Sequence, residues 1–155
     1  MLKKCEFVLN NLRDEDLVEL KALWQGDWKN KVLNSLSETK VLFAYGYDEF
    51  YDVIPIAMGG FYELFDDKLK IACVWLLTTK YVNQNKMALM KELKNQISLA
   101  DKKYDLMYNF IYKSNFEAKS WLKKFGFSFD NPNPEGLKIK ENFEFFYKLT
   151  NRKEE

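Results

Sequence analysis

Apolar residues recur along this chain in two spacings, and each spacing predicts one kind of element. Alternating or unbroken apolar runs predict strands, at 6–12, 41–45, 53–64, 69–79, 105–112 and 143–149. Apolar residues three and four positions apart predict helices, at 13–24, 28–36, 82–102 and 115–125. The resulting order, β-α-α-β-β-β-α-β-α-β, predicts one α+β domain over residues 1–150 with a mixed sheet. The polar segment 151–155 is predicted to be a disordered tail.

Local signals refine three of these elements. The run 69–79 is apolar on both faces, which is typical of a central strand covered on both sides. Gly59 and Gly60, inside the preceding strand, indicate a bulge or the close approach of another backbone. Asn115 is predicted to cap the helix that follows it, and Gly126 to end that helix in a left-handed conformation.

Composition excludes several classes of protein. The chain of 155 residues is 47% apolar and 17% aromatic, which is enough for a sizeable core. Its formal net charge of +1 gives no bulk argument for a nucleic-acid or membrane partner, and we expect neither. No apolar run reaches the roughly 20 residues of a membrane span, and the N-terminus lacks the apolar stretch of a signal peptide, so secretion is not expected.

Cysteine and histidine content restricts the chemistry further. The two cysteines, Cys5 and Cys73, both lie in strand-like runs and outside any Cys-x-x-Cys pair, so we interpret them as buried thiols of a reducing cytoplasm. The chain has no histidine, which removes the usual general base and the commonest metal ligand, and we expect no metal. Cys73 has no base beside it, and burial should raise its pKa and keep it inert.

Aromatic residues gather around the hairpin predicted over 45–62, at Tyr45, Tyr47, Phe50, Tyr51 and Tyr62. Packing in the core and at its rim is the simpler interpretation. A binding surface is the alternative, because aromatic residues are enriched in interface hot spots.

The element order, with Asn115, Ala118, Gly126 and Phe127 at the spacing Asn-x-x-Ala and Gly-Phe, resembles the GCN5-related N-acetyltransferase (GNAT) superfamily. The resemblance covers roughly residues 6–149. It implies a GNAT-like α+β fold, with a central mixed, mostly antiparallel sheet flanked by helices and with splayed fourth and fifth strands. Shorter stretches are similar to the phage internal virion protein A family, GNAT-like proteins of phages and prophages: 55–60, 74–79, 106–115 and 121–127.

The resemblance implies a site for acetyl-CoA or another acyl-CoA. Splayed strands leave backbone groups for the pantetheine arm, and the next helix N-terminus offers N–H groups to the pyrophosphate. The implied cofactor-binding residues follow the chain: Leu77, Thr78 and Thr79 at the end of the fourth strand, Lys80, then Val82, Asn85 and Lys86 beside the pyrophosphate, and Asn115 on the cofactor arm. Asn109, on the fifth strand, is predicted to hydrogen-bond the backbone of a splayed strand.

Three departures from the family pattern bear on catalysis. The segment 78–86 contains no glycine, so Cβ atoms stand where backbone should approach phosphate, and Lys80 and Lys86 are the compensating cations. Leu122 occupies the position of the family's general-acid tyrosine. The fourth strand carries no carboxylate base, and the nearest acids by topology, Glu49 and Glu63, are more simply interpreted as solvated surface acids.

Two hypotheses of function follow, and neither assigns a catalytic residue. The departures favour a phage- or prophage-encoded protein with a degenerate acyl-CoA site, acting as a virion-associated or host-interaction protein in the host cytoplasm or virion. Its phage or host protein partner would bind the aromatic hairpin 45–62. The alternative is an acetyl-CoA-dependent N-acetyltransferase for a small-molecule or protein amine, in which proximity drives aminolysis. The oligomeric state is not predicted.

Overall fold

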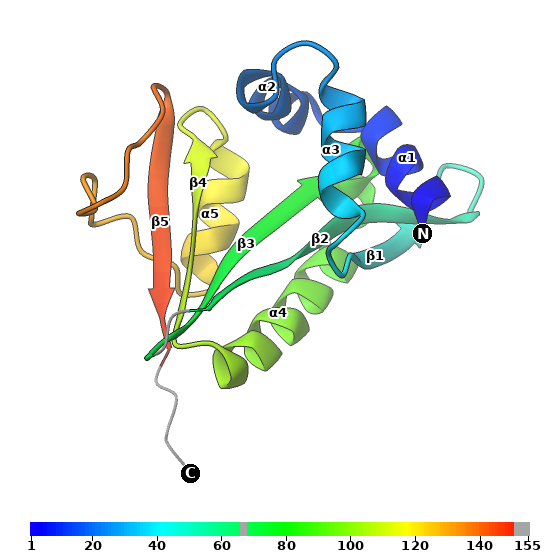
Figure 1. Cartoon of the computed structure of the whole chain (residues 1–155). Coiled ribbons are helices and arrows are strands. Elements are labelled where there is room, and N and C mark those ends of the chain that lie inside the picture. Colours follow the sequence, from blue (N-terminus) through cyan, green and yellow to red (C-terminus); the bar gives the residue numbers. More distant parts are fainter. Residues whose placement is uncertain (66–67, 151–155) are drawn as a thin grey trace. The chain divides into compact units, whose positions relative to one another are not determined.

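The computed structural model describes residues 1–65 and 68–150 (Figure 1). The helices are α1 (Leu2–Asn10), α2 (Asp14–Leu23), α3 (Trp28–Leu36), the 3-10 helix η1 (Lys80–Gln84), α4 (Lys86–Lys103) and α5 (Phe116–Lys124). The strands are β1 (Leu42–Tyr47), β2 (Val53–Phe65), β3 (Lys70–Thr78), β4 (Leu106–Tyr112) and β5 (Phe143–Leu149). Residues 66–67, between the predicted strands 53–64 and 69–79, and the predicted tail at 151–155 lie outside the described residues.

The strands are hydrogen-bonded in the order β1-β2-β3-β4-β5. β1 pairs antiparallel with β2, and β4 pairs antiparallel with β5, whereas β3 and β4 are parallel. The helix α4 connects the two parallel strands, as a parallel pair requires. This arrangement confirms the predicted mixed sheet. No helix in the described part of the chain is long and apolar enough to cross a membrane.

The chain forms two compact units, and each is described by itself. Unit 1 consists of Met1–Gly60 and Trp75–Leu93, and unit 2 of Phe61–Val74 and the described residues from Lys94 onward. The elements β2, β3 and α4 each contribute one part to either unit. A single domain over 1–150 stays a prediction.

The first element of unit 1 corrects the sequence prediction. The strand predicted over 6–12 is wrong, because the chain forms helix α1 there and Cys5 is helical. The buried residues of α1 are Cys5, Val8 and Leu9, at helical spacing on one face. In a segment this short the apolar pattern is compatible with a strand and with a helix, so the packing of its side chains determines which of the two forms. Leu12 keeps one strand-like contact, an antiparallel bridge to Thr79.

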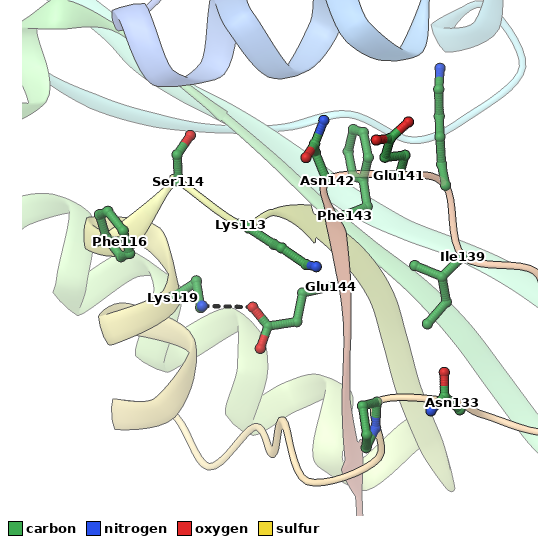
Figure 2. A pocket seen from close by; sticks show the side chains of 12 residues that line it. Lys113, Ser114, Phe116, Lys119, Asn133, Ile139, Glu141, Asn142, Phe143 and Glu144 are labelled. Carbon is green, nitrogen blue, oxygen red and sulfur yellow. Dashed lines mark ion pairs between the residues drawn. The ribbon is translucent and has the colours of Figure 1, made fainter.

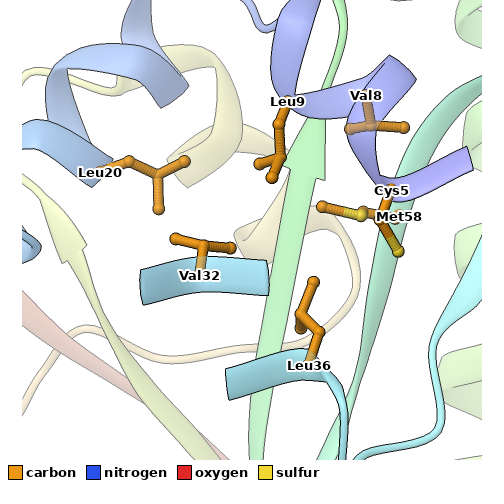
Figure 3. Packing of buried hydrophobic residues seen from close by; sticks show 7 residues of the cluster. All are labelled: Cys5, Val8, Leu9, Leu20, Val32, Leu36 and Met58. Atoms are coloured by element: carbon orange, nitrogen blue, oxygen red, sulfur yellow. The ribbon is translucent and has the colours of Figure 1, made fainter. Parts of the chain in front are cut away.

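The core of unit 1 is built around these α1 side chains. Figure 3 shows them converging with residues of α2, α3 and β2: Leu20, Val32, Leu36 and Met58. Helix α3 lies beside α1 in the same unit (Figure 1). Each fully buried side chain of this kind contributes roughly 1.5–3 kcal/mol, so the apolar stripes of the three helices hold them on β2.

Gly59 and Gly60 lie where other backbone comes close. A Cβ on Gly59 would stand 2.7 Å from the Trp75 carbonyl oxygen, and one on Gly60 would stand 2.9 Å from that of Lys40. The predicted close approach is therefore confirmed. The irregularity in the β1–β2 register lies elsewhere, between Ala44 and Tyr45.

The helix predicted over 82–102 begins later than expected. The chain first forms η1, and α4 starts only at Lys86, after Asn85 with its non-helical φ of −131°. Met87, one of the apolar residues whose spacing predicted this helix, is 88% exposed, whereas Leu89 is fully buried. The predicted helix is therefore present, but it begins at Lys86 and not at residue 82.

Unit 2 has its own core. Its buried members come from β3, α4, β4, β5 and the segments that follow α4 and α5: Ala72, Ala100, Tyr104, Met107, Ile111, Phe127 and Phe146. Ala118 and Leu122 of α5 pack against them. The Asn115 Oδ1 accepts the Ala118 N–H at 3.4 Å, and Gly126 has φ +92°, which confirms both predicted ends of α5.

Candidate functional site

The two edges of β3 have different partners at its C-terminal end. The Thr79 N–H donates to the Ile56 carbonyl of β2 at 2.9 Å, and the Thr79 hydroxyl donates to the same oxygen at 2.8 Å. Backbone groups of successive residues in an extended strand point to opposite edges. The N–H and C=O of Thr78 and Leu76 therefore lie on the edge that faces away from β2.

Thr78 is held on that outer edge by a buried ionic network. Its N–H donates to Asp16 Oδ2 at 3.0 Å, and its hydroxyl donates to the same oxygen. Its carbonyl accepts the Arg13 N–H at 3.0 Å, and the Arg13 guanidinium bonds Asp16 with Nε···Oδ2 at 3.3 Å. All three residues are buried. Asp16 lies in the first turn of α2, where the helix dipole favours a carboxylate.

The turn after β3 uses its backbone donors internally. The Lys80 N–H donates to the Asn11 carbonyl at 2.9 Å, and the Val82 N–H donates to that of Thr79 at 3.1 Å. The Tyr81 N–H donates to the Thr79 hydroxyl at 3.3 Å. Since a phosphate-binding turn works through available N–H groups, residues 80–82 offer a ligand few donors.

Donors are exposed one turn later, at the start of α4. The first N–H groups of an α-helix have no acceptor within the helix, and in α4 they include those of Met87 and Ala88. Both residues are exposed, as is Lys86 before them. Together with the exposed Lys80, they make the α4 N-terminus the electropositive part of this connection.

Asn85 acts as a clamp between two segments. Its Oδ1 accepts the Tyr47 N–H at 3.0 Å, and its Nδ2 donates to the carbonyls of Tyr47 and Tyr81, both at 2.9 Å. A Cβ at Gly46 would stand 2.5 Å from this Oδ1, so glycine is needed for the contact. The side chain of Asn85 therefore holds the end of β1 against η1, a role that no local sequence signal indicated.

Seven of the eight predicted cofactor-binding residues lie in unit 1, from the last residues of β3 to the first residue of α4: Leu77, Thr78, Thr79, Lys80, Val82, Asn85 and Lys86. Val82 is fully buried, and Leu77 packs against the core of unit 1. Asn115 belongs to unit 2 and is 2% exposed. The predicted cofactor contacts of all eight stay predictions.

The pairing of β3 with β4 is short. Its register runs over three pairs and ends at Cys73 with Tyr108. Immediately beyond, the Asn109 Nδ2 donates to the Val74 carbonyl at 2.6 Å, and the Asn109 Oδ1 accepts the Phe110 N–H at 2.7 Å. The prediction that Asn109 bonds the backbone of a neighbouring strand is confirmed.

The candidate bases by topology are surface acids. The Glu63 carboxylate pairs with Lys103 Nζ at 2.6 Å and accepts the Tyr104 hydroxyl at 2.7 Å. These two hydrogen bonds, that from Lys103 first, hold the pKa of Glu63 below its usual value, which weakens it as a base. Glu49 is exposed in the β1–β2 connection. The interpretation of both as surface acids is confirmed.

Cys73 is half-buried, whereas the sequence predicted a buried thiol, but it has the inert character predicted for it. Burial raises the pKa of its thiol to about 11, so the thiolate is scarce at neutral pH. A nucleophilic role is therefore not supported by the structure.

A hollow of about 1010 Å³ opens in unit 2, between the start of α5 and the segment before β5 (Figure 2). Three lysines and two carboxylates face it: Lys113, Lys119, Lys140, Glu141 and Glu144. Lys119 and Glu144 form an ion pair at 2.6 Å inside it. Charges of both signs line the hollow, so it shows no preference for an anion or a cation. No group of three metal-ligating residues occurs among the residues described.

No protein-family model and no curated protein sequence matches the chain. Solved structures do match it. An acetyltransferase of the GNAT family from Bacillus anthracis has a TM-score of 0.61 and 16% identity, covering 96% of this chain and 90% of its own. A spermidine N-acetyltransferase, a chimera of SpeG from Vibrio cholerae and hSSAT, gives 0.61 and 13%, covering 96% and 91%. An aminoglycoside N(6')acetyltransferase from Legionella pneumophila gives 0.60 and 17%, covering 95% and 87%.

At these identities the likeness shows the fold, and the chain has the predicted α+β GNAT fold. Because α1 stands in place of the first predicted strand, β3 and β4 are the predicted fourth and fifth strands. The hydrogen-bonded pairing between β3 and β4 covers only three residue pairs, as expected for the predicted splayed strands.

Proposed function

We propose that this chain binds an acyl-CoA along the outer edge of β3 and transfers the acyl group to an amine, as a GNAT-type N-acyltransferase. One observation carries the proposal: in a GNAT fold, the β3–β4 ladder stops at Cys73 with Tyr108, before the end of β3. The three solved structures compared above, which share the fold, are acetyltransferases, and this supports the same class of reaction.

The backbone of Leu76 is the proposed contact for the pantetheine arm. This arm is extended and contains amides, so it can pair with a strand edge as an added strand does. On the outer edge of β3, Thr78 is already bonded to Asp16 and Arg13. Thr79 faces β2, and alternation places Leu77 on that side as well. We therefore assign the arm to Leu76 in preference to Leu77 and Thr79.

The start of α4 is the proposed place for the pyrophosphate. The N–H groups at Met87 and Ala88 and the positive end of an 18-residue helix favour an anion there. Lys80 and Lys86 add positive charge on the same connection. This arrangement compensates for the missing glycines by placing the donors on the helix and leaving the turn 80–82 to its internal bonds.

The proposed chemistry is direct aminolysis. The amine nitrogen attacks the thioester carbonyl carbon, the C–S bond breaks, CoA leaves as a thiolate that takes up a proton, and the surplus proton of the new amide nitrogen passes to water. β3 contains no Asp or Glu, and the Cys73 thiol stays protonated at neutral pH. The chain therefore contributes position and orientation, which can be worth several kcal/mol of the barrier.

Calorimetric titration with acetyl-CoA tests the proposal. We expect binding at millimolar concentration or tighter, followed by thiol release on addition of a polyamine, an aminoglycoside or a lysine peptide. A Leu76→Pro variant lacks the proposed donor and should lose affinity while staying folded, because this N–H faces away from β2. Leu77→Pro is the matched control, and it should lose stability because its N–H faces β2. The absence of heat and of thermal stabilisation at millimolar acetyl-CoA would contradict the proposal.

A second candidate function is binding without catalysis, as a virion-associated or host-interaction protein of a phage or prophage. One observation favours it: Phe50 and Tyr51, in the aromatic hairpin 45–62, are 76% and 85% exposed. Tyr51 also has φ +61°, an uncommon conformation for a bulky residue. Aromatic residues are enriched in the hot spots of partner surfaces. Mass spectrometry of purified virions from a host that carries the gene tests this candidate, and absence of the chain from them would oppose it.

A further inference from the structure

We infer that Asn109 is a positioning residue, whose carboxamide stops the β3–β4 ladder and leaves the Leu76 backbone available to the acyl-CoA arm. The inference deepens the proposed function and rests on it for the identity of the ligand. Its structural part, the interruption of the ladder by a side chain, rests on hydrogen bonds within unit 2 alone.

The register shows which bond a regular ladder would form next. Lys70 marks the edge of β3 that pairs, since its carbonyl accepts the Asp105 N–H at 2.7 Å and its N–H donates to the Asp105 carboxylate at 2.9 Å. Alternation puts Val74 on the same edge. Continued past Cys73 and Tyr108, the parallel register would join the Phe110 N–H directly to the Val74 carbonyl.

The Asn109 side chain takes the place of that bond. Its Oδ1 accepts the Phe110 N–H at 2.7 Å, and its Nδ2 donates to the Val74 carbonyl at 2.6 Å. Two hydrogen bonds in series through a carboxamide thus replace one direct bond, and they hold the two backbone groups further apart. Both backbone groups keep a partner, so the ladder ends without leaving a buried polar group unsatisfied.

The asparagine carboxamide meets both requirements of this position. The side chain must accept at one atom and donate at the other while it starts from the residue next to Phe110. Aspartate has the same shape but no donor for the Val74 carbonyl, and an aliphatic residue has neither group. Glutamine carries the same groups on a longer stem that displaces them from both partners.

The open length of the outer β3 edge is therefore bounded on both sides. The Val74 carbonyl is taken by Asn109, and Thr78 is taken by Asp16 and Arg13. Leu76 is the residue between them on that edge. In the described residues no hydrogen bond joins its N–H or C=O to another residue on this side. A ladder that continued beyond Val74 would use this pair of groups first.

Backbone and side-chain amide exchange measured by NMR, together with acetyl-CoA titration, tests the inference on the full chain. In the unmodified protein the Asn109 side-chain NH₂ should exchange slowly compared with that of Asn133, which lies in an exposed loop. In Asn109→Val, the Phe110 N–H can donate directly to the Val74 carbonyl. Hydrogen exchange of the Leu76 amide should then become about tenfold slower, because the strand pairing extends to Leu76. Tyr108→Phe, on the same strand, is the matched control and should leave Leu76 exchange unchanged.

The readouts separate the two claims. Weakening of acetyl-CoA binding by about tenfold in Asn109→Val, with the midpoint of thermal unfolding within a few degrees, supports both of them. Slowed Leu76 exchange in a protein that binds no acetyl-CoA overturns the proposed function and keeps the role of Asn109 in the ladder. If the Asn109 NH₂ exchanges as fast as that of Asn133, or if Asn109→Val leaves Leu76 exchange unchanged, the inference is overturned. The Asn133 comparison needs no variant to fold.

Discussion

Replacing Asp16 with alanine should lower the free energy of unfolding by about 3–5 kcal/mol, the range for breaking a buried ion pair from one side. Asp16 is 3% exposed, and its carboxylate accepts the Thr78 N–H at 3.0 Å, the Thr78 hydroxyl and the Arg13 Nε at 3.3 Å. Truncation removes this carboxylate from beside the buried Arg13 guanidinium. It also removes the acceptor of the buried Thr78 N–H and hydroxyl. The loss should therefore be several times that of an exposed ion pair.

Asp14→Ala is the matched control. Asp14 lies in the same first turn of α2 but is exposed, so its removal should cost only the helix-dipole contribution, about 0.3–1 kcal/mol. Urea unfolding followed by circular dichroism measures both variants, and the comparison holds where the denaturant slope is unchanged. If Asp16→Ala costs no more than Asp14→Ala, the buried network does not stabilise the end of β3 and the reasoning is refuted.

The same network connects stability to the proposed site. Thr78 ends the outer edge of β3 two residues beyond Leu76, and Asp16 fixes its N–H and hydroxyl. Asp16→Asn keeps the shape and removes the charge, so it should fold and still loosen this strand end. We expect weaker acetyl-CoA binding in Asp16→Asn and unchanged binding in Asp14→Asn, measured by calorimetry.

Two further predictions concern single residues. Tyr51→Asn should raise the free energy of unfolding by about 1 kcal/mol, because asparagine tolerates the φ of +61° better than tyrosine does. Phe50→Asn, at the neighbouring exposed position, is the control and should not raise it. A lower midpoint of thermal unfolding for Tyr51→Asn would contradict the argument. For Cys73, burial raises the pKa from 9.0 to about 11, so its contribution to stability is complete below pH 9 and is lost as the pH rises toward 11. Between pH 9 and pH 11 the free energy of unfolding of the unmodified protein should fall by about 2–3 kcal/mol more than that of Cys73→Ala. Urea unfolding measures both proteins, and an equal fall in the two would show that the thiol ionises freely.

Local patterns in the sequence predicted much of the fold. The helices α2, α3 and α5 and all five strands follow from apolar spacing, and the two ends of α5 follow from Asn115 and Gly126. These features are readable because a periodic face, an N-cap and a left-handed glycine depend on residues within one or two turns of each other. The inert thiol of Cys73 follows in the same way from an apolar strand without a neighbouring base.

The tertiary structure alone decided the first element and the details of the candidate site. Whether residues near Cys5 form a strand or a helix depended on their packing against α2, α3 and β2. Asp16 and Thr78 are 62 residues apart in the chain, Asn85 and Tyr47 38 apart, and Asn109 and Val74 35 apart. A side chain that bonds a backbone group so distant leaves no periodic signal, because its partner is fixed by the register of strands and not by spacing. The sequence therefore determined that a GNAT-like sheet would form, and the long-range hydrogen bonds decided which edge of β3 remains open.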